Sequence, residues 1–353
     1  MSQLGGIGGI GGIGGIGGIS SLIDPANPLL ANAKNRSRGA LVGPFQALAA
    51  APVLSPVDNV AALKKWDPTP RLQTCMIDLL SGLHVAPDAG NPTQMNLGFV
   101  DLSALAAPMP LAKLVRPTAA IFQKQLSLVA NYAELREDRG AEVLTQIPNQ
   151  NEFWGPVIGL NAHRHRRTLE LMALAMTLAN AIEMRLKHAF ACLRPDELSP
   201  QIQPMIPTPG HGAWPSGHAT EIYMTATVLG ALVPAPVINT ETRVQLDRLA
   251  ARVAVNRTVA GVHYPVDSAA GRLLGTALGE FFAARCGVVG DVLCRTFNGT
   301  AFHGAQGAVQ DFDPRVSLNG GAPYYAQAAQ GTAVVVSPLL QFLWKEAAGE
   351  WQV

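Results

Sequence analysis

The stretches KHAFACLRP (residues 187–195), PSGH (215–218) and RTVAGVHYPVD (257–267) carry most of what this chain reveals about itself. Seven of their side chains make one set of three cations, two imidazoles, a hydroxyl and a carboxylate, namely Lys187, Arg194, Arg257, His218, His263, Ser216 and Asp267. Cationic donors of this kind hold oxyanions, and an imidazole can bond the central atom of such an anion. The three stretches therefore predict one site for a tetrahedral or trigonal-bipyramidal oxyanion.

The first stretch places Lys187 and Arg194 seven residues apart, which is two turns of a helix. We expect both on one face of a long helix that spans residues 162–192, where they can converge on one anion. Pro195 disfavours the helical conformation at Arg194 and so ends the helix. The alternative is a solvated basic helix end, which the helix dipole favours.

The second stretch predicts a helix that begins at Ser216, a good N-cap, and continues to about residue 232. Gly217 has no side chain, so its N–H can approach a ligand closely. The free N–H groups of a helix start and the Ser216 hydroxyl bind anionic oxygen. His218 follows in the first turn, placed for general acid–base work. The alternative is an ordinary capped helix with an incidental histidine.

The third stretch pairs His263 with Asp267, four residues later. The carboxylate can accept one imidazole N–H, which leaves the other ring nitrogen as nucleophile or ligand. Arg257 adds a planar fork of donors for the oxygens of an anion. The alternative for Asp267 is a plain stabilising contact with a helix dipole.

Elsewhere the chain is predicted to be mainly α-helical. Helices are expected over residues 240–256, 267–286 and 337–348, and helical spacing recurs near 60–85 and 110–135. Residues 20–60 are predicted to form an irregular wrap. Thr332–Val336 is the best of few strand candidates. We expect one α-helical domain over residues 21–353, with long loops and its site region at 187–267.

Residues 1–20 form a separate low-complexity tail that contains five Gly-Gly-Ile triplets. Glycine at this density is costly to order, so a flexible tail is one interpretation and an assembly device is another. The cysteines Cys75, Cys192, Cys286 and Cys294 form no metal-binding pattern. Cys286 and Cys294 are near enough in sequence to bridge, although buried thiols are the simpler expectation.

The balance of charge is nearly neutral, at a formal +1, which gives no reason to expect a nucleic-acid partner. Hydrophobic residues make up 48% of the chain, enough for a large core. We see neither a secretory signal nor an apolar run long enough for a membrane span. A cytoplasmic location is therefore the default expectation.

The three stretches, in this order and spacing, resemble the signature of the type 2 phosphatidic-acid phosphatase superfamily. That superfamily includes bacterial class A acid phosphatases and vanadium-dependent haloperoxidases. The resemblance covers residues 187–267 and implies a helical bundle with the oxyanion site in its core. The third stretch usually begins Ser-Arg, whereas here it begins Asn256-Arg257, which leaves any role for a hydroxyl there in doubt.

The resemblance also implies roles for the residues. His263 would bond the central atom, Asp267 would orient it and His218 would handle the proton on the opposite side. The equatorial oxygens would be held by Lys187, Arg194, Ser216, Gly217 and Arg257.

Two activities fit these roles. In a haloperoxidase the site would hold vanadate as cofactor, with His263 on the vanadium, and would oxidise bromide or iodide with hydrogen peroxide for a small organic acceptor. In a soluble acid phosphatase, phosphate esters would occupy the same site and His263 would form a phosphohistidine.

The length of the chain before Lys187 and the position of His211 make us expect the haloperoxidase. His211 lies five residues before Ser216, where the resemblance implies tuning of a halide pocket in favour of bromide or iodide. Its alternative is a plain loop histidine. Trp214 is expected to pack beside the site. The resemblance also allows a homo-oligomer.

Overall fold

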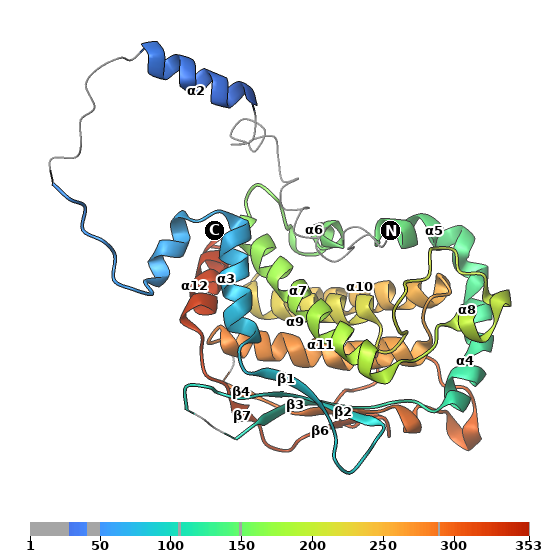
Figure 1. The fold of residues 1–353 in the computed structure, drawn as a ribbon. Coiled ribbons are helices and arrows are strands. Elements are labelled where there is room, and N and C mark those ends of the chain that lie inside the picture. The colour runs from blue at the N-terminus through green and yellow to red at the C-terminus, as the bar shows by residue number, and fades with distance from the viewer. Residues whose placement is uncertain (1–27, 41–49, 105–106, 148–149, 289, 353) are drawn as a thin grey trace.

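The computed structural model describes residues 28–40, 50–104, 107–147, 150–288 and 290–352 of the chain. The Gly-Gly-Ile tail lies outside these residues, so the expectations for it stay predictions. The described chain is mainly helical, as predicted, with long loops between its helices (Figure 1).

The centre of the fold consists of α7 (Arg166–Phe190), α9 (Gly217–Leu232), α10 (Thr240–Val259) and α11 (Pro265–Arg285). Helix α9 packs against each of the other three (Figure 1). The predicted ranges for these helices are confirmed to within a few residues at each end. All three stretches of the oxyanion motif thus lie at ends of central helices.

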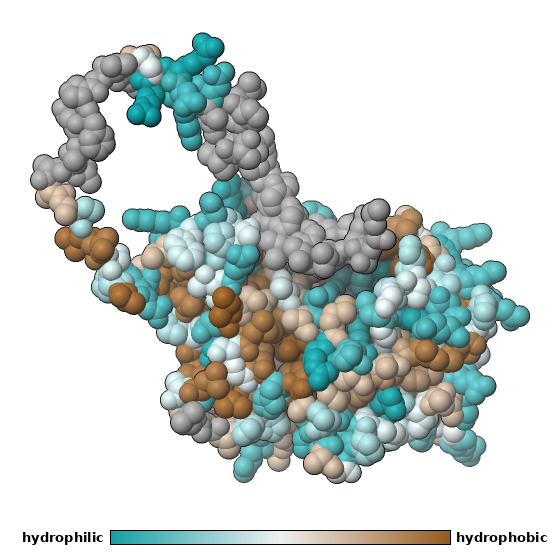
Figure 2. Space-filling model, viewed as in Figure 1, coloured by the Kyte–Doolittle hydropathy of each residue, from teal (hydrophilic) through white to brown (hydrophobic). Residues whose placement is uncertain are grey.

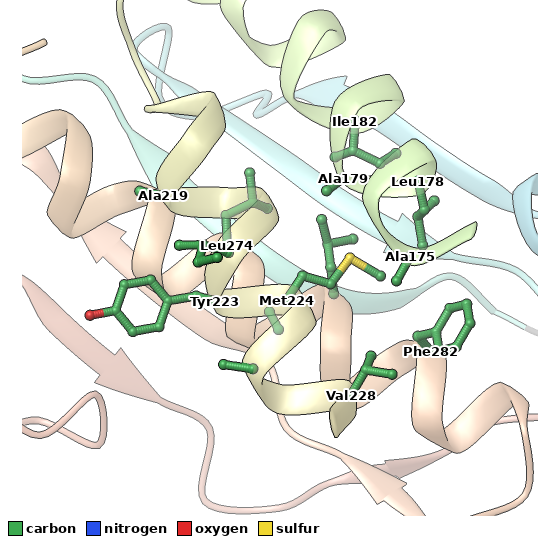
Figure 3. Close-up of a cluster of buried hydrophobic side chains, with 14 of the residues drawn as sticks. Ala175, Leu178, Ala179, Ile182, Ala219, Tyr223, Met224, Val228, Leu274 and Phe282 are labelled. Carbon is green, nitrogen blue, oxygen red and sulfur yellow. The ribbon is translucent and has the colours of Figure 1, made fainter. Parts of the chain in front are cut away.

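Helix α7 forms because its apolar residues recur every three or four positions and so share one face. That face is buried and consists of Leu171, Leu174, Leu178, Ile182 and Leu186. Figure 3 shows Met224 of α9 pointing toward Ala175 and Leu178 of α7 in this core. Each fully buried leucine contributes about 1.5–3 kcal/mol of transfer free energy.

A row of glycines lets α9 and α11 approach closely. Gly271, Gly275 and Gly279 recur every fourth residue on the face of α11 that meets α9. A methyl group built on Gly271 would lie 2.7 Å from the carbonyl oxygen of Ser216, and one on Gly275 would lie 2.9 Å from the nitrogen of Met224. Because no larger residue fits there, the row brings the N-termini of the two helices together.

Further helices surround this centre. They are α3 (Pro68–Leu80), α4 (Ala119–Tyr132), α5 (Arg136–Thr145), α6 (Gly155–Ile158), α8 (Pro195–Leu198) and α12 (Pro338–Gly349). Helix α2 (Pro28–Ala40) lies apart from them (Figure 1). Short 3-10 turns lie at residues 60–65, 133–135, 151–153, 200–202, 299–301 and 305–307. Helix α2 corrects the prediction that residues 20–60 are wholly irregular, and α12 confirms the helix expected near 337–348.

A small sheet lies against α11, opposite the helices α7 and α10 (Figure 1). Its strands run in the order β1 (Leu83–Pro87), β2 (Gln94–Phe99), β3 (Met109–Val115), β5 (Arg295–Asn298), β6 (Tyr325–Gln327). Neighbours are antiparallel except β3 and β5, which are parallel. Strands β4 (Asp291–Val292) and β7 (Thr332–Ala333) form a separate antiparallel pair.

The sequence prediction missed most of this sheet. Leu111, Leu114 and Val115 have helical spacing, yet they lie in β3, where both faces of the strand are covered. A strand buried on both faces loses its alternating pattern and cannot be told from a helix by periodicity. Only β7 falls within the predicted strand candidate at 332–336.

All four cysteines are free thiols, so Cys286 and Cys294 form no bridge. Three of them are buried and Cys294 is partly exposed. The visible surface mixes hydrophobic and hydrophilic side chains, with hydrophobic ones around α3 and α7 (Figure 2). Such scattered apolar exposure is ordinary for a chain with this composition.

Candidate active site

The N-terminus of α9 provides the anion-binding end that the sequence predicts. Ser216 is the N-cap in extended conformation, and its Oγ accepts a hydrogen bond from the N–H of Ala219 at 3.4 Å. The N–H groups of Gly217 and His218 are the first of the helix and have no acceptor within it. They form a pair of donors at the positive end of the helix dipole.

The start of α11 lies directly beside the start of α9. The N–H of Ser216 donates to the carbonyl oxygen of Asp267 at 3.0 Å. Oδ2 of Asp267 in turn lies 2.8 Å from Nδ1 of His263 and accepts from the N–H of Tyr264 at 3.0 Å. The carboxylate therefore fixes both the loop before α11 and the orientation of the imidazole.

The second ring nitrogen of His263 faces Arg194, whose Nη1 lies 3.1 Å from Nε2. A guanidinium can only donate, so Nε2 must accept, and Nδ1 carries the proton that goes to Asp267. Burial, with Arg194 and Lys187, holds the pKa of His263 well below its usual range, while burial raises the pKa of Asp267 to about 7. The imidazole is thus neutral, with its lone pair on Nε2.

Lys187 and Arg194 do not share a helix face, contrary to the prediction. Helix α7 ends at Phe190, and Ala191 turns the chain in the left-handed region with φ 49°. Arg194 lies beyond this turn in extended conformation, with φ −76° and ψ 160°, as expected of a residue before proline. The two cations converge through the loop instead.

Both cations brace the loops around the site. Nζ of Lys187 donates to three backbone carbonyls, those of Gly212 (3.2 Å), Ala213 (3.1 Å) and Pro215 (2.5 Å). Arg194 donates to the carbonyls of His211 (3.0 Å) and Val262 (2.7 Å). Burial lowers the pKa of Lys187 to about 8. These charges therefore position backbone as well as attract an anion.

Arg257 differs from them because it keeps unused donors. It is 1% exposed, and its Nη2 donates to Oε1 of Gln146 at 2.8 Å and to the carbonyl of Val143 at 3.2 Å. Its Nε and Nη1 are buried and have no partner among the residues that the structure describes. A buried donor left unpaired costs about 1–3 kcal/mol. The free edge of this guanidinium therefore fits an anionic ligand.

His218 stands at the same helix start with Nε2 buried and without a partner. Burial and the neighbouring Arg257 lower its pKa to about 3, while a hydrogen bond with the backbone of Gln146 opposes this. Its imidazole is therefore neutral near pH 7 in the site as it stands.

His211 also reaches the site, since its Nδ1 lies 3.1 Å from Nη2 of Arg194. Burial, Lys187 and Arg194 lower its pKa to about 4. Trp214 is fully buried and packs edge-on against Phe190, with ring centroids 4.5 Å apart. It supports the loop between His211 and Ser216, next to the site as predicted.

Asn256, where the signature has serine, turns away to α5. Its Nδ2 donates to Oε1 of Glu142 at 2.8 Å and to Oε1 of Gln146 at 3.2 Å. The amide thus joins α10 to α5, and Gln146 then contacts Arg257. The departure from the signature serves the docking of α5.

Sequence reasoning missed three residues of this site. Glu183 and Glu221 place carboxyl groups near the cations, and burial raises the pKa of both. Gln146 anchors Arg257 from α5. A signal existed for Glu183, because Asn180, Glu183 and Lys187 lie three and four residues apart and so form a polar row on one side of α7. Gln146 lies far from the motif and has no such signal.

The assembled site holds a neutral imidazole, an unpaired guanidinium edge, a helix N-terminus and a second imidazole. Such a set binds a tetrahedral oxyanion and can stabilise its five-coordinate state, because the charge that develops meets donors already in place. The geometry thus brings all nine residues that the sequence singled out into one region.

Comparison with known proteins agrees with the signature. A family described as the PAP2 superfamily matches residues 169–285, so this part of the chain carries a PAP2 superfamily domain. The decaprenylphosphoryl-5-phosphoribose phosphatases of two Mycobacterium tuberculosis strains, CDC 1551 / Oshkosh and ATCC 25618 / H37Rv, are 32% identical over 118 residues. That match spans 33% of this chain and 60% of each relative.

Among solved structures, a transmembrane PAP2 type phosphatidylglycerolphosphate phosphatase from Bacillus subtilis is similar. It shares 19% identity, with a TM-score of 0.37 over 46% of this chain and 84% of that one. The relatives found are phosphatases, and they give no support to the haloperoxidase that we expected.

The default prediction of a cytoplasmic location is corrected, because the relatives found give it no support. Within the residues that the structure describes, no helix has both the length and the apolar character needed to cross a membrane.

Proposed function

We propose that this chain hydrolyses phosphate monoesters through a covalent intermediate on His263. The observation that carries the proposal is the neutral His263, whose Nδ1 is held by Asp267 at 2.8 Å and whose Nε2 lone pair is directed at Arg194, 3.1 Å away. The phosphatase relatives support this choice over the haloperoxidase.

In the first step, Nε2 of His263 attacks phosphorus and the bond from phosphorus to the ester oxygen breaks. Arg257 and the N–H groups at the start of α9 take the negative charge on the equatorial oxygens. Arg194, which now donates to Nε2, has to transfer that hydrogen bond to a phosphate oxygen to free the lone pair. The substrate thus completes the site on binding.

His218 manages the proton on the side opposite His263. It protonates the leaving alcohol, and in the second step it takes a proton from the water that attacks the phosphohistidine. Phosphate leaves and His263 regains its lone pair. Because His218 is neutral before binding, the incoming anion has to raise its pKa, which a neighbouring negative charge does.

A vanadium-dependent haloperoxidase is the second candidate, and one contact favours it. His211 lies 3.1 Å from Arg194, so a further imidazole borders the anion site. Vanadate is a tetrahedral oxyanion like phosphate, and the unpaired donors of Arg257 fit either. Lys187, Arg194, Ser216, Gly217 and Arg257 would hold it, with His263 on vanadium. Bound vanadate would supply the centre at which hydrogen peroxide oxidises bromide or iodide.

A paired assay on the purified protein separates the candidates. One arm follows release of phosphate from an aryl phosphate without vanadate. The other adds vanadate, hydrogen peroxide and bromide or iodide, and follows halogenation of a dye. We expect hydrolysis that vanadate inhibits and His263→Ala abolishes. Halogenation that requires vanadate, without hydrolysis, would instead establish the second candidate and a role for His211.

A further inference from the structure

Glu183 carries a buried carboxyl group with one unpaired oxygen. The residue is 2% exposed, and its Oε2 makes no hydrogen bond to the residues that the structure describes. Among the ion pairs of the described residues none includes it. Glu170, the other buried glutamate of α7, pairs with both Arg71 and Arg167. Burial of a carboxyl group without an ion pair costs free energy, so we expect a functional role for Glu183.

The carboxyl group lies against the helix start where the anion is expected. Glu183 precedes Lys187 by one turn of α7 and faces Gly217 of α9. A methyl group built on Gly217 would collide with Oε1 and lie 3.0 Å from Cδ of Glu183. The lack of a side chain at residue 217 therefore admits this carboxyl to the first turn of α9.

The surroundings favour the uncharged acid. Burial and the nearby Glu221 of α9 raise the pKa of Glu183 well above its usual range, although Lys187 and Arg194 oppose them. His218, the next residue after Gly217, carries no charge in this site. A protonated carboxyl has one O–H to donate, and Oε2 has no acceptor in the described part of the chain.

We propose that Glu183 is a further oxyanion-binding residue, whose carboxylic acid donates a hydrogen bond to an oxygen of the phosphate group held at the start of α9. This inference rests on the proposed function and adds a pH limit to it. When Glu183 ionises, it loses the donor and turns a negative charge toward the anion. Binding then weakens about tenfold for each pH unit above the pKa of the carboxyl, because only the protonated fraction is competent.

The test is the dissociation constant of inorganic phosphate, measured by calorimetry between pH 5 and pH 9. Wild-type protein is compared with Glu183→Gln, which keeps a donor and cannot ionise. The ionisation of phosphate itself changes both dissociation constants equally, so its effect cancels in their ratio. Glu241→Gln, an exposed glutamate on α10, is the matched control. We expect the wild-type to Gln ratio to rise with pH and the control to follow wild type.

Glu183→Ala provides a second variant in case the amide disturbs folding. It should bind phosphate more weakly than wild type at pH 5, and the ratio of its dissociation constant to that of Glu183→Gln should stay constant with pH. A ratio that stays constant from pH 5 to pH 9, in a wild-type protein that binds phosphate and hydrolyses esters, would overturn the inference alone. A wild-type protein that neither binds phosphate nor hydrolyses esters would overturn both the proposed function and the inference about Glu183.

Discussion

His263 and Asp267 form a buried pair in which Nδ1 of the imidazole lies 2.8 Å from Oδ2 of the carboxylate. The pair joins the loop residue His263 to the first turn of α11, and the same oxygen accepts the N–H of Tyr264 at 3.0 Å. The orientation of the proposed nucleophile is therefore built into the start of a helix rather than into a free loop.

Replacing Asp267 with Asn tests this orientation. The amide can donate to Nδ1 and favours the tautomer with its proton on Nε2, which removes the nucleophilic lone pair. We expect kcat for an aryl phosphate to fall by about 100-fold or more, with a smaller change in KM. Steady-state kinetics with a thermal melt as folding control would check it. An Asn variant that is folded and has normal kcat would contradict the role of Asp267.

Arg257→Lys tests the free edge of the guanidinium. Lysine keeps the charge but loses the planar fork, so Nε and Nη1 no longer meet two oxygens. We expect kcat/KM to fall by about 100-fold. Arg252→Lys, an exposed position on the same helix, is the matched control and should leave kcat/KM unchanged. Equal values for the two variants would rule out the proposed contact.

We expect His218 to become protonated when an oxyanion binds to the site. Its pKa of about 3 lies below that of free histidine, so at pH 6 the imidazole is neutral before the anion arrives. A bound oxyanion offsets the charge of Arg257 and raises this pKa, so binding takes up a proton and strengthens as pH falls. Calorimetry at pH 6 in two buffers of different ionisation enthalpy measures the uptake. His218→Asn should abolish most of it, and an unchanged uptake would refute the assignment.

The central helices were predictable because their apolar residues recur with helical spacing and their ends carry clear signals. Ser216 marks a start that the structure reproduces. Pro195, predicted to end the long helix, instead begins α8, and α7 already ends at Phe190 before the left-handed Ala191. The sheet was not predictable in the same way. Its strands are short, β3 is covered on both faces, and the pairing of β3 with β5 joins residues almost two hundred positions apart.

The glycine row on α11 offers a direct test of how the fold positions the site. A methyl group on Gly275 meets the backbone of α9, which cannot move without separating the helices. We expect Gly275→Ala to lower the free energy of unfolding by about 1–3 kcal/mol and to reduce kcat. Gly349→Ala in α12 meets no atom within 4 Å and serves as control. If denaturant unfolding gives both variants the same free energy of unfolding, the glycine row does not control the packing of α9 against α11.

The motif residues of the site were predictable from their spacing, but the contacts that each of them makes were not. Lys187 and Arg194 were expected to grip the anion, whereas the structure shows them donating chiefly to loop carbonyls. Gln146 and Glu183 come to the site only through the packing of α5 and α7 against α10 and α9. Contacts of this kind depend on tertiary structure, which the spacing of a motif does not contain.

The most direct test of the account is to look for the phosphohistidine. His218→Asn should slow attack by water, while an aryl leaving group needs little protonation, so the covalent intermediate should accumulate. The reaction is quenched with alkali and the peptides are examined by mass spectrometry. The account predicts a phosphoryl group on His263, absent from His263→Ala. Sustained hydrolysis with no phosphoryl group on His263, or full turnover by His263→Ala, would contradict it.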